Sequence, residues 1–198
     1  KVYRQKDRGF VSLLDRVRTN TLDQDDLDVL NSRVEKHLTD DDLFITLTSS
    51  NFSAEAINKS RLAKLPGDTF KYIADVDGAF QASRFPADQL LQLKEGAQVI
   101  FVKNDPERRY VNGTLGKVVV CNHTTVMVDA YMDGEINRIE LEAQSWETVV
   151  YKLEEEAGKV DIKAEVIGSF SQLPVKLAWA MTIHKSQGKT FDRVIIDL

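Results

Sequence analysis

The residues best equipped for chemistry lie near the carboxyl end of the 198-residue chain. An apolar run long enough for one buried strand begins at Leu173. The seven residues that start at Thr182 then supply two hydroxyls, an imidazole, an ammonium, an amide and a glycine, with no carboxylate before Asp192. A polar loop at the carboxyl end of a buried strand is where open α/β sheets bind ligands. Because this loop is rich in donors and its glycine allows close backbone approach, it suits phosphate oxygens.

The triplet Gly188-Lys189-Thr190 matches the end of the nucleotide-binding pattern G-x-x-x-x-G-K-[ST]. The first glycine of that pattern would fall at position 183, which is Ile183, and no other match exists in the chain. The sequence therefore contains no phosphate-cradling P-loop, and we do not expect this chain to hold ATP firmly by itself.

His184 has the chemistry of a metal ligand or a general base. The other histidines are His37 and His123, and the single cysteine is Cys121, so no cluster with metal-ligand spacing is present. A Ser186–His184 nucleophile pair lacks an orienting acid in a fixed motif. Hydrogen bonding to a phosphate or a base is the preferred interpretation, and a histidine that merely ends a strand is the structural alternative.

Composition places the chain among soluble globular proteins, with 42% hydrophobic and 29% charged residues. No apolar run approaches the roughly 18–20 residues of a membrane span, and we expect no membrane partner. A single cysteine fits a reducing compartment, and we expect a cytoplasmic (bacterial-type) or nucleoid-associated location. The net charge of −5 argues against nucleic-acid binding, but cations outnumber acids six to two in residues 1–19 and four to two in residues 173–198.

The first part of the chain alternates helical and extended patterns, which indicates an α/β layer structure. Apolar spacing predicts a helix over residues 8–19. Thr21 or Asp23 is expected to cap a second helix, whose apolar stripe comprises Leu27, Leu30, Val34 and Leu38.

A strand over residues 43–48 and a further helix through Leu65 are predicted next. Asn51 or Ser53 is the expected cap of this helix. Residues 69–76 are predicted to be extended.

From about residue 85 the pattern changes to short strands separated by turn signals. The predicted strands cover residues 97–102, 115–121, 125–130, 135–141, 147–153 and 159–167. So many short strands in about 80 residues favour a small antiparallel barrel. We therefore predict an α/β domain in residues 1–84, an inserted barrel in 85–172, and a return to the α/β domain in 173–198.

Residues 173–197 resemble motif V of superfamily 1 DNA helicases of the RecD and Pif type, P-[LV]-K-L-A-W-A-x-T-I-H-K-S-Q-G-x-T-F-[DE]. Other segments resemble family motifs in the same order along the chain. Val2-Tyr3-Arg4-Gln5-Lys6-Asp7 is similar to the R-Q-x-D motif, and Leu47-Thr48-x-x-Asn51 to the next conserved segment. Residues 93–104 and 111–116 are similar to the opening of an SH3-like barrel. The resemblance covers almost the whole chain.

The resemblance implies a partial second RecA-like (P-loop NTPase-type) domain with an inserted SH3-like barrel. It further implies part of an ATP-dependent, 5′-to-3′ helicase that moves on single-stranded DNA and unwinds duplex in repair, recombination or replication. The family's Walker A and B motifs would precede Lys1 and its motif VI would follow Leu198. We therefore expect a C-terminal portion that does not hydrolyse ATP alone. ATP and Mg²⁺ would bind the full-length protein, with the missing N-terminal RecA-like domain as partner.

The resemblance also assigns site residues. It makes Arg4 the arginine finger supported by Gln5, and it places Gln187, Gly188 and Thr190 near the nucleotide. The residues implied to meet single-stranded DNA are Thr48, Asn51, Thr182, His184, Lys185 and Ser186. Asn51 has a structural alternative as a helix cap. For the whole chain the alternative function is an SH3-like module that binds protein or nucleic acid without motor activity.

Overall fold

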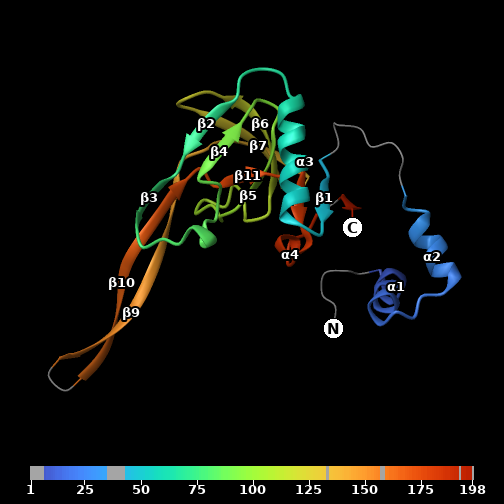
Figure 1. Ribbon diagram of the computed structural model, residues 1–198, viewed down its shortest axis with the longest axis horizontal. Coiled ribbons are helices and arrows are strands. Elements are labelled where there is room, and N and C mark those ends of the chain that lie inside the picture. The colour runs from blue at the N-terminus through green and yellow to red at the C-terminus, as the bar shows by residue number, and fades with distance from the viewer. Residues whose placement is uncertain (1–6, 35–42, 133, 157–158, 192, 198) are drawn as a thin grey trace. The chain divides into compact units, whose positions relative to one another are not determined.

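A computed structural model describes residues 7–34, 43–132, 134–156, 159–191 and 193–197. The chain divides into two compact units, Lys1–Asp42 and Leu43–Leu198, and each is described by itself (Figure 1). No helix among the described residues has both the length and the apolar character needed to cross a membrane.

The first unit contains helices α1 (Arg8–Thr19) and α2 (Gln24–Asn31). The Asp7 carboxylate accepts hydrogen bonds from the first backbone N–H groups of α1, and Asp23 forms a capping box with Asp26 at the start of α2. Asp26 also pairs with Arg16, which joins the two helices. The helix predicted over residues 8–19 is confirmed, and Asp23 rather than Thr21 is the second cap.

The second helix is shorter than predicted. The Ser32 N–H donates to the Asp28 carbonyl and its hydroxyl to the Val29 carbonyl, so the last turn closes there. Val34, which was predicted to continue the apolar stripe, lies beyond the helix with 67% of its surface exposed. Leu38 lies outside the described residues.

The second unit contains a parallel sheet with β1 (Ile45–Thr48) between β12 (Ala180–Thr182) and β13 (Val194–Asp197). Helix α3 (Asn51–Lys64) packs against β1 and β12. The prediction that Asn51 or Ser53 caps this helix is wrong. The cap is Ser50, whose Oγ accepts the Ser53 N–H at 3.1 Å, and Asn51 is the first helical residue.

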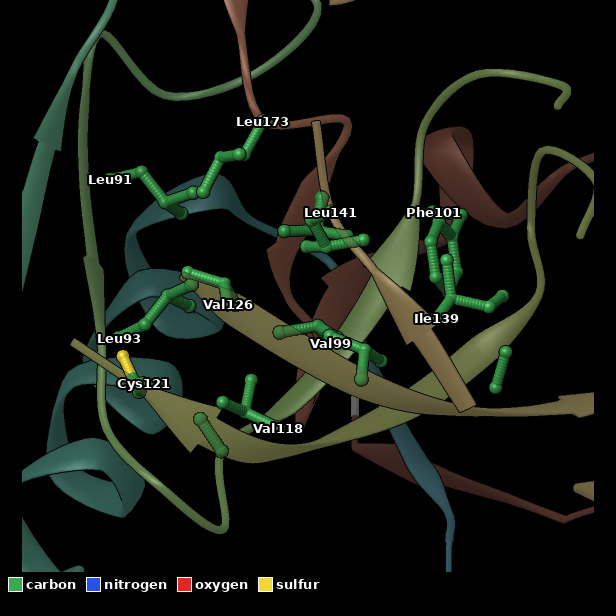
Figure 2. Packing of buried hydrophobic residues seen from close by; sticks show 14 of the residues in the cluster. Leu91, Leu93, Val99, Phe101, Val118, Cys121, Val126, Ile139, Leu141 and Leu173 are labelled. Atoms are coloured by element: carbon green, nitrogen blue, oxygen red, sulfur yellow. The ribbon is translucent and has the colours of Figure 1, made fainter. Parts of the chain in front are cut away.

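An antiparallel sheet has the strand order β11-β5-β6-β7-β8. Its strands are β11 (Val175–Leu177), β5 (Gln98–Phe101), β6 (Leu115–Cys121), β7 (Val126–Met132) and β8 (Glu135–Glu140). Alternate residues of these strands form the main core with a separate pair, β2 (Phe70–Ile73) and β4 (Leu90–Leu93) (Figure 2). The described pairing ends at β11 and β8, so the structure does not show the predicted closed barrel.

The two longest strands form a hairpin outside that sheet. Strands β9 (Gln144–Glu156) and β10 (Lys159–Gln172) pair with each other and, through β10, with β3 (Asp75–Gly78). The hairpin extends away from the five-stranded sheet (Figure 1). At its base Phe170 is fully buried against Phe80, Phe85 and Trp146, and the short 3₁₀ helix η1 (Ala82–Arg84) lies between Phe80 and Phe85 in the chain.

One face of this hairpin is apolar and exposed. Val149 lies opposite Val166, Tyr151 opposite Ala164, and Leu153 opposite Ile162, whereas Lys152 and Glu165 form an ion pair on the other face. Leu153 is 73% exposed. The structure does not show these strands in a barrel, since β9 and β10 pair with each other and with β3 in a separate sheet. An exposed ribbon with one apolar face has the same alternation as a strand with one buried face.

The apolar run that begins at Leu173 forms two short strands, which belong to two different sheets. Its first part is β11, antiparallel to β5, and its second part is β12, parallel to β1. The prediction of one buried strand here is wrong. Gln98 stands where the sheets meet: its Nε2 donates to the carbonyls of Phe44 and Ala178, each at 2.8 Å. This junction sets the direction in which β12 delivers the polar segment that follows.

Candidate nucleic-acid interface

The carboxyl ends of β1 and β12 lie next to each other. The strands are parallel, and their register places Thr48 beside Thr182. Only 1% of Thr48 and 6% of Thr182 is exposed, and the Thr48 hydroxyl donates to the Ser50 carbonyl at 3.0 Å. The structure therefore brings these two predicted residues together, but their side chains are nearly covered. The groups that reach solvent at this edge come from the turns that follow each strand.

Helix α3 holds β12 in place through one side chain. The Asn58 amide donates to the Ala180 carbonyl and accepts the Ala180 N–H, both at 2.9 Å. This pair of hydrogen bonds satisfies both backbone polar groups of Ala180 with a helix residue that lies 122 positions earlier in the chain. It fixes the middle of α3 against the first residue of β12, the strand that leads to the polar residues from Thr182 onward.

The turns after the two strands are joined by Asn51 and Lys185. Thr182 precedes the short helix α4 (Ile183–Ser186), and the Lys185 ammonium donates to Asn51 Oδ1 at 3.0 Å. Both side chains are exposed, as is His184. Ser186 is half-buried, and its hydroxyl donates to the Ile183 carbonyl at 2.7 Å. An ammonium, an amide and an imidazole are therefore accessible together, and all three can donate to phosphate oxygens.

Lys176 on β11 lies close enough to Lys185 for the charge of Lys185 to affect its pKa. Burial lowers the pKa of Lys176, the carboxylate of Asp88 raises it in part, and the charge of Lys185 lowers it again. The Lys176 ammonium lies 3.9 Å from Asp88 Oδ1. Lys176 is thus half-buried beside Asp88, whereas Lys185 is exposed and adds positive charge next to Asn51, where it can attract a polyanion.

The residues predicted to lie near a nucleotide follow α4 directly. Gln187, Gly188 and Thr190 are all exposed, and Gly188 has a φ of +82°, a left-handed conformation that suits glycine. Arg4 and Gln5 lie outside the described residues, so the arginine-finger role stays a prediction. Among the described residues, no group of three or more His, Cys, Asp or Glu side chains is placed to hold a metal ion.

Several structurally important residues were not identified as such from the sequence. Gln98 and Asn58 position the strands, and Lys189 donates from Nζ to Asn112 Oδ1 at 2.6 Å. A glutamine within the apolar segment 97–102 was an available signal, because a buried polar side chain needs partners. The Lys189 contact gave no local signal, since its partner lies 77 residues away.

A family model described as DNA helicase Pif1, 2B domain, matches residues 80–121. The chain is 34% identical to an ATP-dependent DNA helicase PIF1 from Xenopus laevis over all of its length, and it covers 30% of that protein. It is 30% identical to an ATP-dependent DNA helicase Pif1 from Bdellovibrio bacteriovorus, with 98% of the chain and 42% of that protein covered. The chain therefore spans less than half the length of these relatives.

Solved structures of a Pif1 helicase from Bacteroides have the same fold. The unliganded form superposes with a TM-score of 0.85 at 32% identity and covers 100% of this chain and 45% of that chain. The TM-score is 0.83 for a complex with ADP-AlF4 and 0.70 for a complex with single-stranded DNA. Each of these structures is 32% identical to this chain, and the match covers 99% of this chain and 44% of the Bacteroides chain. The similarity thus includes both the parallel sheet and the antiparallel sheet.

Proposed function

We propose that this chain, which is a portion of a Pif1-family DNA helicase and includes the 2B domain, supplies the single-stranded DNA grip of the second motor domain in an ATP-dependent helicase. The observation that carries the proposal is the meeting of two turns at one sheet edge. Thr48 lies beside Thr182, and the turns after them are joined by the bond from Lys185 to Asn51. The related helicase from Bacteroides binds single-stranded DNA, which supports this ligand.

The grip would act mainly on phosphates. An ammonium has three donors. One of those on Lys185 is used by Asn51, and two remain for phosphate oxygens. Asn51 accepts through Oδ1, so its Nδ2 can donate to the same strand. His184 is exposed one position before Lys185 and adds a further donor. None of these groups reads a base edge, so we expect binding that is independent of sequence and sensitive to salt.

The nucleotide side of the proposal rests on the segment that follows the grip. Gln187, Gly188 and Thr190 come directly after α4, and a motor needs one element that senses nucleotide and DNA together. In this proposal ATP and Mg²⁺ are held mainly by an N-terminal RecA-like domain, and Arg4, supported by Gln5, faces the γ-phosphate. The Bacteroides relative binds ADP-AlF4. The 198-residue chain alone would not hydrolyse ATP.

The wider role is a further step of the same proposal. The full-length protein would translocate 5′-to-3′ along single-stranded DNA and unwind duplex during repair, recombination or replication. The lone buried cysteine, Cys121, fits a reducing, cytoplasmic or nucleoid-associated setting.

The test is the ATPase activity of the full-length helicase with Lys185→Ala. Loss of one phosphate contact should reduce the stimulation of ATP turnover by single-stranded DNA, while turnover without DNA stays the same. Lys59→Ala is the matched control, because Lys59 is an exposed lysine of α3 paired with Glu55. Equal stimulation of the Lys185→Ala and Lys59→Ala proteins would contradict the proposed grip.

A further inference from the structure

Lys189 contacts a turn of the five-stranded sheet. Its Nζ donates to Asn112 Oδ1 at 2.6 Å. A Cβ built on Gly113, which has a φ of +104°, would lie 3.5 to 3.7 Å from Nζ, Cγ and Cδ of Lys189, so the lysine side chain lies over this glycine. Lys189 is half-buried, and burial lowers its pKa. The lysine of the Gly188-Lys189-Thr190 triplet therefore already has a hydrogen-bond partner within the chain.

The turn that receives Lys189 is well anchored. The Asn112 N–H donates to Asn104 Oδ1 at 2.8 Å, and the Gly113 N–H donates to the Phe101 carbonyl at 2.9 Å. Thr114 is buried with 7% of its surface exposed, and its Oγ1 accepts the Val111 N–H. Several hydrogen bonds to β5 and its adjoining loop thus fix the position of Asn112.

The segment that carries Lys189 is anchored far less. Its exposed residues are Ile183, His184, Lys185, Gln187, Gly188 and Thr190. Segments with few buried contacts open at low free energy, so contacts with other parts of the chain help to decide where such a segment lies. Near its carboxyl end, Asn112 receives Lys189, and Phe191 packs against a second core cluster.

A continuous series of bonds runs from Asn112 to the proposed DNA grip. Asn112 accepts from the Lys189 side chain, and the Lys189 N–H donates to the Ser186 carbonyl at 3.0 Å. Ser186 ends α4, which carries Lys185, and Lys185 donates to Asn51. A chain of hydrogen bonds and one helical turn is the kind of contiguous network through which one site can constrain another.

We propose that Lys189 is a positioning residue, whose bond to Asn112 holds residues 183–190 so that Lys185 and Asn51 face the DNA strand. The five-stranded sheet thereby acts on the grip without touching the nucleic acid at this point. The DNA part of this inference rests on the proposed function, whereas the bond and its effect on residues 183–190 do not. The competing role is direct contact of Lys189 with a phosphate.

The experiment uses the full-length helicase with Lys189→Met, Asn112→Ala and both changes together. Methionine keeps the length and apolar stem of lysine and removes the donor. Binding to a fluorescent oligothymidine is measured by anisotropy at several salt concentrations. We expect each single variant to bind about 2- to 10-fold more weakly, the range that corresponds to the net contribution of one hydrogen bond. The double variant should bind no more weakly than the singles.

Two further variants complete the set. Asn112→Asp keeps an acceptor for the ammonium and should bind within about 2-fold of the unchanged protein, since charge-assisted bonds are at least as strong. Lys71→Met removes an exposed lysine of β2 and should leave binding unchanged. The slope of log affinity against log salt should also stay the same in Lys189→Met, because no phosphate contact is lost. A slope smaller by about 0.7, together with normal binding by Asn112→Ala, would overturn the positioning role in favour of direct contact.

Amide hydrogen exchange without DNA tests the bond by itself. Exchange of residues 183–190 should be faster in both Lys189→Met and Asn112→Ala than in Lys71→Met. Equal exchange in all three proteins would refute the inference, whatever the DNA results. If the exchange changes as expected but no variant or parent protein binds single-stranded DNA, the proposed function fails and the positioning of the segment stands.

Discussion

The junction at Gln98 offers the sharpest test of the fold, through Gln98→Leu. Gln98 is buried, with 6% of its surface exposed, and its Nε2 donates to the carbonyls of Phe44 and Ala178 at 2.8 Å each. Leucine has a similar volume and fills the same space, but it supplies no donor. The substitution therefore removes two hydrogen bonds without opening a large cavity.

The expected loss follows from the acceptors that remain. A buried acceptor left without a partner costs about 1–3 kcal/mol, and two carbonyls lose the same donor here. Better burial of leucine offsets about 1 kcal/mol of this cost. We therefore expect Gln98→Leu to lower the free energy of unfolding by about 1–5 kcal/mol. Gln98→Glu should be worse at neutral pH, because a carboxylate would face two carbonyl oxygens.

Urea unfolding followed by circular dichroism measures this difference. The midpoint should fall while the dependence on urea stays the same, which indicates a change in stability rather than in the exposed surface. Gln89→Leu is the control, since Gln89 is an exposed glutamine near β4. If the unfolding free energy of Gln98→Leu is less than about 1 kcal/mol below that of Gln89→Leu, the two hydrogen bonds do not stabilise the junction.

Two further predictions concern the second unit. Hydrogen bonds from Arg109 lower the pKa of the buried Asp105 carboxylate, so its stabilisation should be present above the unfolded pKa of about 4 and lost as the pH falls through the lower folded value. Urea titrations between pH 2 and 7 should show a smaller loss of stability in acid for Asp105→Asn, and equal losses would contradict the prediction. Leu153→Lys on the exposed face of the hairpin should change the unfolding free energy by less than about 0.5 kcal/mol, whereas Phe170→Ala at its buried base should lower it by about 3–5 kcal/mol. Similar changes in unfolding free energy for Leu153→Lys and Phe170→Ala would mean that packing at the base of the hairpin does not stabilise the fold.

The sequence predicted elements well where the pattern was local. The helix over Arg8–Thr19 has a clear apolar stripe and an aspartate cap, and its bounds were predicted correctly. Strand β6 also has its predicted bounds, Leu115–Cys121, because alternation and turn residues mark both ends. In each case the signal lies within the element itself.

Tertiary pairing could not be predicted in the same way. The apolar run after Leu173 divides between two sheets at Ala178 and Trp179, and nothing in its composition distinguishes a strand that pairs with β5 from one that pairs with β1. The sheet to which β9 and β10 belong could not be predicted for a related reason, since apolar alternation does not reveal whether the apolar face is covered. These errors arise from partners that lie far away in the chain.

The site was predicted residue by residue through family resemblance, but its geometry was not. Thr48, Asn51, Thr182 and Lys185 belong to segments more than 130 positions apart, and the structure brings them to one edge. Asn58, Gln98 and the Lys189–Asn112 bond hold that edge in place through long-range contacts. The sequence identified the groups that could touch a ligand more readily than the groups that position them.

The central claim is that the turns after β1 and β12 grip the phosphates of single-stranded DNA. Its most direct test is the salt dependence of oligothymidine binding by the full-length helicase, with and without Lys185→Ala. We predict weaker binding and a slope of log affinity against log salt that is smaller by about 0.7, the value for one lost phosphate contact on a single strand. An unchanged affinity and an unchanged slope would contradict the claim.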